Sequence, residues 1–199
     1  HASSVAALME NVGSGAVTAT FNEIENADVA IVIGANPIEN HPVAATYFKQ
    51  FTQRGGKLIV FHGLADTLVP PGQSVDFFER HAARMGSSSA LAENARLFMA
   101  PGMMHCGGGT GPDAFNSTLG IPPRPPSFDP QNDLFSALIA WAEEDEAPDR
   151  ITATRFADDR SGKITMQRPL CPWPQRAVYR GVGSTDAASS FRCEAPAKP

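Results

Sequence analysis

The sequence is poor in cysteine and has no long apolar run. Its 199 residues include three cysteines, and no two of them form a Cys-x-x-Cys pair. The cysteines and histidines are too scattered along the chain to predict a zinc site, and no other metal site is expected. No apolar run approaches the ~20 residues of a membrane span. The first residues also lack the apolar segment of a signal peptide. The sequence therefore predicts neither a membrane segment nor a leader.

The chain has no excess of positive charge either. Sixteen Lys and Arg residues stand against 21 Asp and Glu residues, which gives a formal net charge of −5. Nucleic acids and anionic membranes bind basic surfaces, so neither is expected as a partner. Hydrophobic residues make up 42% of the sequence, which is ordinary for a globular protein. The length suits one domain with a real core, or a domain with an appendage.

The odd number of cysteines leaves one without an obvious partner. Cys171 and Cys193 both fall in a loop-rich tail, which they could close with a disulfide in an oxidising compartment. Cys106 remains and lies next to His105 in the sequence. It is either a buried thiol or one half of a bridge whose other half is missing.

Two apolar runs in the middle of the chain organise the rest of it. Residues 58–61 and 97–99 are short runs bounded by Gly and Pro, which is typical of strands buried on both faces. A helix predicted over 74–85 separates them, so the loops that follow the two strands should lie at one edge of a parallel sheet. Asp66 is in the first of these loops and His105 in the second. An acid and an imidazole placed in this way are two members of a hydrolase triad.

The flanking segments extend this unit into an α/β fold with a parallel sheet of about three strands. The run VAIVI predicts a buried strand at 29–33, and apolar spacing near 3.6 predicts a helix that begins at His41-Pro42 and ends at Gln53. We expect flanking helices and a loop-rich C-terminal tail. The other expected elements are a helix at 3–9, loops at 86–89 and 107–130, a helix at 134–144, and short strands at 151–154 and 177–179.

Residues 55–193 resemble the C-terminal part of the tannase and feruloyl esterase family. The resemblance rests on blocks that follow one another in the family's order: Gly56-Lys57-Leu58-Ile59-Val60, His62-Gly63-x-Ala65-Asp66, Pro70-Pro71-Gly72, Pro101-Gly102-Met103-x-His105-Cys106-Gly107-Gly108-Gly109, Gly111-Pro112-Asp113-Ala114-Phe115, Ala147-Pro148-Asp149-Arg150 and Arg168-Pro169-Leu170-Cys171-Pro172.

The resemblance implies a truncated α/β-hydrolase domain over residues 55–199 that acts on small-molecule esters of aromatic or polyester type. It implies Asp66 as the triad acid and His105 as the general base. It also implies a disulfide between Cys171 and Cys193 that staples the tail, and with it a secreted or periplasmic location. No cofactor is implied for this part of the family.

The family's nucleophile is missing from the sequence. In the family, the nucleophilic serine lies in an upstream Cys-Ser-x-Gly-Gly block, and the cysteine of that block bridges to the cysteine after the catalytic histidine. Neither this block nor the family's inserted lid, which often holds calcium, occurs here. Among replacements, Ser14 is better explained as a turn residue, Ser3 and Ser4 as terminal residues, and Cys106 as too near His105 in sequence. A water activated by His105 is a further alternative.

Residues 1–54 show a different resemblance, to the catalytic subunit of molybdopterin-dependent formate dehydrogenases. It rests on Gly13-Ser14-Gly15-Ala16, on the segment from Phe21 to Asp28, and on Ile33-Gly34-Ala35-Asn36-Pro37-x-Glu39-Asn40-His41-Pro42. It implies a chimera in which this strand–helix segment forms one compact unit with the rest of the chain. Asn36, Glu39 and His41 could contact a dinucleotide, although an ordinary strand-end turn explains them as well.

Three hypotheses about function follow. The first is a carboxylic ester hydrolase of the tannase and feruloyl esterase type that keeps the acid and base. The second is a catalytically silent α/β fragment or scaffold. The third is a weak pterin or nucleotide binder through residues 11–42. An exposed sheet edge also predicts a homodimer.

Overall fold

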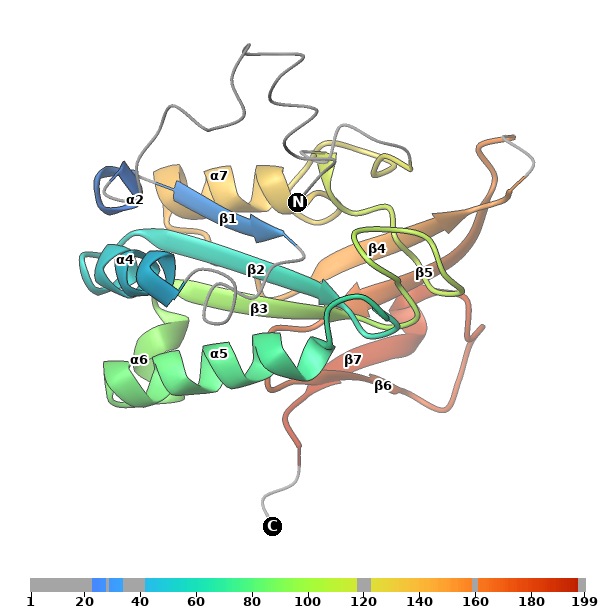
Figure 1. The fold of residues 1–199 in the computed structure, drawn as a ribbon. Coiled ribbons are helices and arrows are strands. Elements are labelled where there is room, and N and C mark those ends of the chain that lie inside the picture. The colour runs from blue at the N-terminus through green and yellow to red at the C-terminus, as the bar shows by residue number, and fades with distance from the viewer. Residues whose placement is uncertain (1–22, 28, 34–41, 118–122, 159–160, 197–199) are drawn as a thin grey trace.

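The computed structural model describes residues 23–27, 29–33, 42–117, 123–158 and 161–196. At its centre is a parallel sheet of three strands in the order β1-β2-β3 (Figure 1). The strands are β1 (Val29–Ile33), β2 (Lys57–Gly63) and β3 (Ala95–Ala100). The described residues therefore have the α/β character that the sequence predicts, and the expected helix at 3–9 lies outside them.

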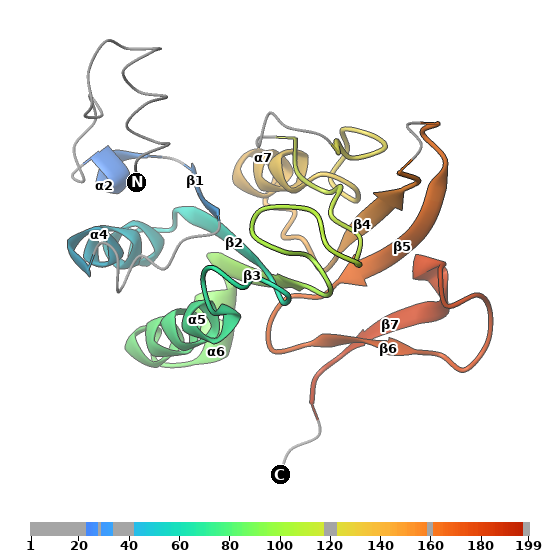
Figure 2. The same cartoon turned by 45° about the vertical axis from the view of Figure 1, so that its right-hand side comes forward.

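Strand β2 lies between the other two strands and is almost fully buried, because helices cover both of its faces (Figure 2). Its side chains alternate between two apolar clusters, with Ile59 and Phe61 in one and Leu58 and Val60 in the other. This alternation follows from the two-residue repeat of a strand. A run of four consecutive apolar residues is consequently buried in full, as expected for a parallel strand between two helical layers.

The helices cover the two faces unequally. Helices α4 (Pro42–Gln53), α5 (Pro71–Met85) and α6 (Ser88–Ala92) lie on one side of the sheet, and α7 (Leu134–Glu144) lies on the other (Figure 2). The short helix α2 (Glu23–Asn26) lies beside α4.

Asp133 caps α7 by accepting a hydrogen bond from the Ser136 backbone N–H. It also binds the hydroxyl and N–H of Ser117, so it ties the long loop to the helix.

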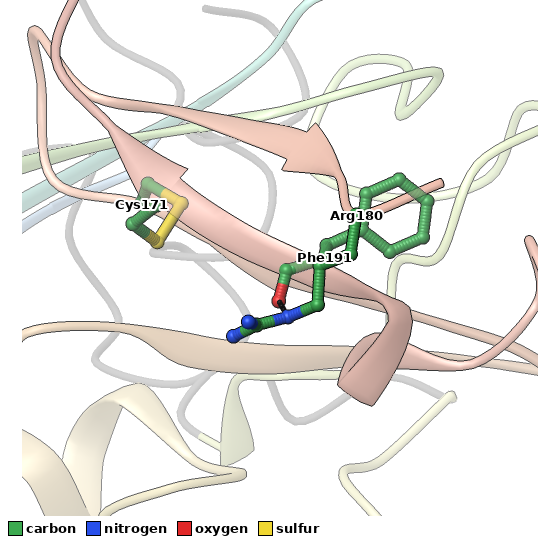
Figure 3. Close-up of a disulfide and its surroundings, with 4 residues drawn as sticks. Cys171, Arg180 and Phe191 are labelled. Carbon is green, nitrogen blue, oxygen red and sulfur yellow. Dashed lines mark hydrogen bonds between the residues drawn. A yellow bond between two sulfur atoms is a disulfide. The ribbon is translucent and has the colours of Figure 1, made fainter. Parts of the chain in front are cut away.

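The C-terminal tail forms two antiparallel pairs of strands. The first pairs β4 (Ile151–Phe156) with β5 (Ile164–Leu170), and the second pairs β6 (Arg176–Tyr179) with β7 (Phe191–Glu194), which follows a short 3₁₀ turn, η2 (Ala188–Ser190). A disulfide between Cys171 and Cys193 joins the end of β5 to β7 (Figure 3). Beside it, the Arg180 side chain donates from Nε to the Phe191 carbonyl at 3.0 Å.

Three expectations about local structure were wrong. The segment 86–89, expected as a loop, contains the start of α6, because the Ser87 side chain accepts a hydrogen bond from the Ala90 N–H and caps a helical turn. Helix α5 begins at Pro71 rather than at residue 74, since proline is favoured in the first turn of a helix. The tail has four strands, not two. Strands β5 and β7 were not predicted because they are only partly buried and show no apolar alternation.

Two features of the fold bear on possible partners. No helix in the described part of the chain is long and apolar enough to span a membrane. Strand β1 is at the edge of the sheet, and among the described residues no strand pairs with its outer side. The homodimer through this edge stays a prediction.

A buried histidine connects two of the helices. His81 of α5 is completely buried, and its Nε2 lies 2.8 Å from the hydroxyl of Thr52 at the end of α4. Its Nδ1 has no hydrogen-bond partner among the described residues. Burial, and then the positive charges of Lys49 and Arg84, lower the pKa of His81 to about 4. The imidazole is therefore neutral at physiological pH, and a proton on it would be both buried and unpaired.

We expect the folded chain to lose stability as the pH falls from about 7 to 4. The unfolded chain binds a proton at His81 with the ordinary pKa of about 6.5, so it holds more protons than the folded chain in this interval. At about 1.4 kcal/mol for each pH unit, the loss from this group is at most about 3 kcal/mol. Urea unfolding at a series of pH values measures it.

The variant His81→Leu provides the comparison, because it removes the titrating group and leaves Thr52 bonded to the Phe48 and Lys49 carbonyls. Its free energy of unfolding should depend less steeply on pH between 7 and 4. Parallel pH curves for the two proteins would contradict the assignment.

Candidate active site

The loops after β2 and β3 meet at one edge of the sheet. Both strands run toward this edge (Figure 1). The N–H of Leu64 donates to the Ala100 carbonyl and that of Ala65 to the Met103 carbonyl, each at 2.9 Å. A Cβ on Gly63 would come within 2.3 Å of the Met103 carbonyl oxygen. Only glycine lets the two loops approach so closely.

This approach brings together Asp66 and His105, which the sequence singled out. The Oδ2 atom of Asp66 lies 2.8 Å from Nδ1 of His105. The Asp66 side chain is almost fully buried, with 1% of its surface exposed, whereas 37% of the His105 side chain is exposed. The acid is therefore shielded from water, and the imidazole extends from it toward the surface.

The local fold holds Asp66 in its ionised form. Its Oδ1 accepts hydrogen bonds from the backbone N–H groups of Leu68 and Val69, at 2.8 and 3.0 Å. Burial by itself raises the pKa of Asp66, but these two bonds and the hydrogen bond and positive charge of His105 outweigh it and lower the pKa to about 2. An ionised carboxylate only accepts hydrogen bonds, so Nδ1 of His105 must donate. In the neutral ring this leaves Nε2 without a proton and able to accept one.

A second histidine binds the same carboxylate oxygen. Nε2 of His62 lies 3.1 Å from Asp66 Oδ2 and 3.0 Å from the Val69 carbonyl, and its Nδ1 lies 2.7 Å from the Ser74 hydroxyl. His62 and Ser74 are both buried. The sequence by itself predicted no role for either residue. A polar residue at the end of an otherwise apolar strand, four positions before Asp66, is the signal that could have identified His62.

The loop that carries His105 is a tight turn. Cys106 has a positive φ of 61°, and the Met104 N–H bonds to the Gly108 carbonyl at 3.2 Å. Asp113 accepts from the Gly108 N–H at 2.7 Å, which fixes the glycine-rich segment. The Cys106 thiol is free and half-buried. Burial, and then the negative charge of Asp66, raise its pKa, so it stays protonated and is a poor nucleophile.

The other candidate residues are not brought to this edge by any described contact. Ser3, Ser4, Ser14, Asn36, Glu39 and His41 lie outside the described residues. Within the described ranges, no group of three or more His, Cys, Asp or Glu side chains is placed to hold a metal ion. Three apolar side chains, Leu64, Leu68 and Met104, are exposed in the two loops that carry Asp66 and His105.

The sequence of this chain matches a known family over most of its length. The family model described as "Tannase and feruloyl esterase" matches residues 36–194. The chain belongs to this family. One relative is mono(2-hydroxyethyl) terephthalate hydrolase of Piscinibacter sakaiensis. It is 36% identical to this chain over 156 residues, which are 78% of this chain and 23% of the relative. A probable feruloyl esterase B of Aspergillus clavatus is 30% identical over 83% of this chain and 31% of its own length.

Two solved structures of esterases resemble this chain over most of its length. An esterase from Aspergillus oryzae superimposes with a TM-score of 0.66 at 28% identity, over 73% of this chain and 28% of the esterase. Feruloyl esterase B from the same organism gives a TM-score of 0.63, also at 28% identity, over 72% of this chain and 28% of its own. The chain therefore spans less than a third of the length of these relatives.

The family match also corrects the boundary drawn from the sequence. It begins at residue 36, so it includes helix α4 and most of the segment between β1 and β2. The sequence resemblance had placed these residues in a formate dehydrogenase segment that ended at residue 54. The relatives found are esterases, and they give no support to that segment or to a chimera. A strand–helix unit that leads into another parallel strand is common to many α/β folds, which explains the misassignment.

Proposed function

We propose that this chain is the acid-and-base part of a carboxylic ester hydrolase, with Asp66 as the triad acid and His105 as the general base. The observation that carries the proposal is the hydrogen bond of 2.8 Å between buried, ionised Asp66 and partly exposed His105. It stands at the sheet edge where α/β folds gather their ligands. Family membership and relatives that are esterases support the reaction class.

The geometry gives each residue a definite task in ester hydrolysis. Nε2 of His105 accepts the proton of the attacking hydroxyl as its oxygen bonds to the ester carbonyl carbon, and it later returns that proton to the departing alkoxide. Asp66 keeps Nδ1 protonated and stabilises the imidazolium formed in between. Its low pKa supports this task, because the carboxylate stays ionised throughout and no proton moves to it.

The block that carries the family's nucleophile does not occur in this sequence. The family's pattern has a serine next to a cysteine that bridges to the cysteine after the histidine, which corresponds to Cys106. The free, half-buried Cys106 fits a bridge partner better than a nucleophile. We infer that the described part of the chain is one structural unit, since β1 pairs with β2 in the same sheet, and that it corresponds to the C-terminal part of the catalytic domain.

The substrates we propose are aromatic or polyester-like esters. The names of these two relatives refer to terephthalate and feruloyl esters. Exposed Leu64, Leu68 and Met104 give the edge around His105 an apolar surface that suits an aromatic group. The disulfide and the family fit a protein that is secreted or periplasmic.

A serine-reactive phosphonate tests the proposal directly. The chain is incubated with an aromatic ester and, separately, with the phosphonate, and the labelled residue is mapped by mass spectrometry. An esterase that acts through a hydroxyl nucleophile hydrolyses the ester and carries the label on one serine. Hydrolysis without a label would indicate a water molecule activated by His105, which is a much slower route.

The competing proposal is a catalytically silent α/β fragment. It is favoured by the share of the relatives that the chain spans, between 23% and 31% of the curated proteins named above. Neither hydrolysis nor label, in a chain whose circular dichroism shows it to be folded, would support this alternative and overturn the esterase proposal for the chain on its own.

A further inference from the structure

The Asp66 carboxylate has more hydrogen-bond donors than an acid and base pair requires. Its Oδ1 accepts two backbone N–H groups, and its Oδ2 faces one nitrogen from each of two imidazoles, His62 and His105. A carboxylate has about four lone-pair sites, so all of its acceptor capacity is used. The two imidazoles differ in exposure: His62 is 1% exposed, whereas a third of His105 reaches the surface. Only His105 is therefore accessible to a substrate.

The surroundings of His62 determine where its proton lies. Nε2 faces two acceptors, the Asp66 carboxylate and the Val69 carbonyl, so it must carry a hydrogen and share it between them. Nδ1 faces the Ser74 hydroxyl at 2.7 Å. In a neutral ring Nδ1 has no hydrogen and accepts the one from the hydroxyl. The two acceptors at Nε2 thus set the tautomer, and Ser74, on α5, helps to fix the plane of the ring.

This arrangement limits how Asp66 can turn. The backbone bonds hold Oδ1, but rotation about the bond that carries the carboxylate could still tilt Oδ2 away from His105. The His62 N–H contacts Oδ2 from a second direction and opposes that tilt. The Val69 carbonyl accepts from the same N–H while the Val69 N–H donates to Oδ1, so the ring, the loop backbone and the carboxylate form one closed set of bonds.

We propose that His62, oriented by Ser74, is a positioning residue that holds Oδ2 of Asp66 toward His105. The proposal rests on the function proposed above for Asp66 and His105. His62 touches neither substrate nor the reacting atoms. It acts through Asp66, as groups behind a catalytic or metal-binding residue commonly do.

The test uses the full 199-residue chain, without substrate. NMR of ¹⁵N-labelled histidine at pH 8, where free imidazoles are neutral, should show His62 with a hydrogen on Nε2 and His105 with a hydrogen on Nδ1. Exchange of the His105 Nδ1 hydrogen with water then reports how firmly Oδ2 holds it. Replacing His62 by Phe keeps a ring of similar size and removes the donor, so this exchange should become about tenfold faster or more.

Two further variants separate positioning from packing. His62→Gln places an amide N–H near the position of Nε2 and should bring the exchange rate back to within about threefold of the unmodified chain. Ser74→Ala keeps the ring and its Nε2 donor but loosens its orientation, and it should give a smaller acceleration than His62→Phe. It also serves as the test if His62→Phe does not fold.

Unchanged exchange in His62→Phe, or in Ser74→Ala where only that variant folds, would overturn the proposal and leave His62 a core residue. A rate in His62→Gln as fast as in His62→Phe would overturn it as well. These measurements need no ester. If they come out as expected while the chain hydrolyses nothing, the proposed function fails and the positioning role stands.

Discussion

Replacement of Asp66 by Asn is expected to lower kcat/KM for an aromatic ester by about 10³- to 10⁴-fold. The amide keeps the size of the carboxylate, and its oxygen can still accept the Leu68 and Val69 N–H groups. Its NH₂ group then takes the place of Oδ2, where it faces the nitrogens of His62 and His105. His105 can satisfy that donor only by accepting at Nδ1, which puts its hydrogen on Nε2. In that tautomer it cannot accept a proton from the nucleophile.

A matched control is available on the neighbouring helix. Asp76→Asn makes the same chemical change at an exposed carboxylate of α5 that pairs with Arg80. It should leave kcat/KM within about twofold, because exposed ion pairs contribute little. Equal rates for Asp66→Asn and the unmodified chain would show that Asp66 is not the triad acid.

The companion variant His105→Ala removes the proton acceptor itself and should cost at least as much. Because the acid and base act as a unit, the double variant should lose little more than either single one. Multiplied losses would instead mean that the two residues act independently. If hydrolysis is unchanged in His105→Ala, the acid-and-base assignment is wrong.

The pairing of Asp66 with His105 could be predicted because it depends on topology. Two apolar runs with a helix between them specify parallel neighbouring strands, and parallel strands end at one edge. Which polar groups surround the pair depends on loop conformation instead. The contacts of Leu68, Val69 and His62 arise from a turn whose shape the residue types alone do not determine. Ser74 is predicted on a helix, but nothing in its spacing indicates that it faces His62.

The tail illustrates a second limit of prediction. Strands β2 and β3 are recognisable because the core buries them, whereas β7, which the sequence did not predict, is held by contacts between distant residues. Arg168 lies over the Phe191 ring, 4.6 Å from its centre, and the Tyr179 and Phe191 rings are 5.6 Å apart. Such contacts leave no periodic pattern in the sequence. The resemblance of residues 36–54 to formate dehydrogenases was wrong for a related reason, because the same strand–helix pattern occurs in many folds.

Removal of the disulfide should cause the largest loss of stability of any change outside the core. Cys171 and Cys193 are 22 residues apart, and they join β5, which packs on the rest of the molecule, to the β6–β7 pair. Closing a loop of this length restricts the unfolded chain, which is worth roughly 3 to 4 kcal/mol by the chain-entropy estimate. The variant that carries both Cys171→Ser and Cys193→Ser should therefore unfold at a clearly lower urea concentration.

Cys106→Ser is the matched control, since it replaces the free thiol by the same residue and breaks no bridge. Its urea midpoint should stay close to that of the unmodified chain. Reduction of the unmodified chain by dithiothreitol should reproduce the double variant, because the same bond is lost. If the double variant and Cys106→Ser have the same midpoint, the tail contributes stability through its strand pairing and ring contacts, and the disulfide does not hold it to the sheet.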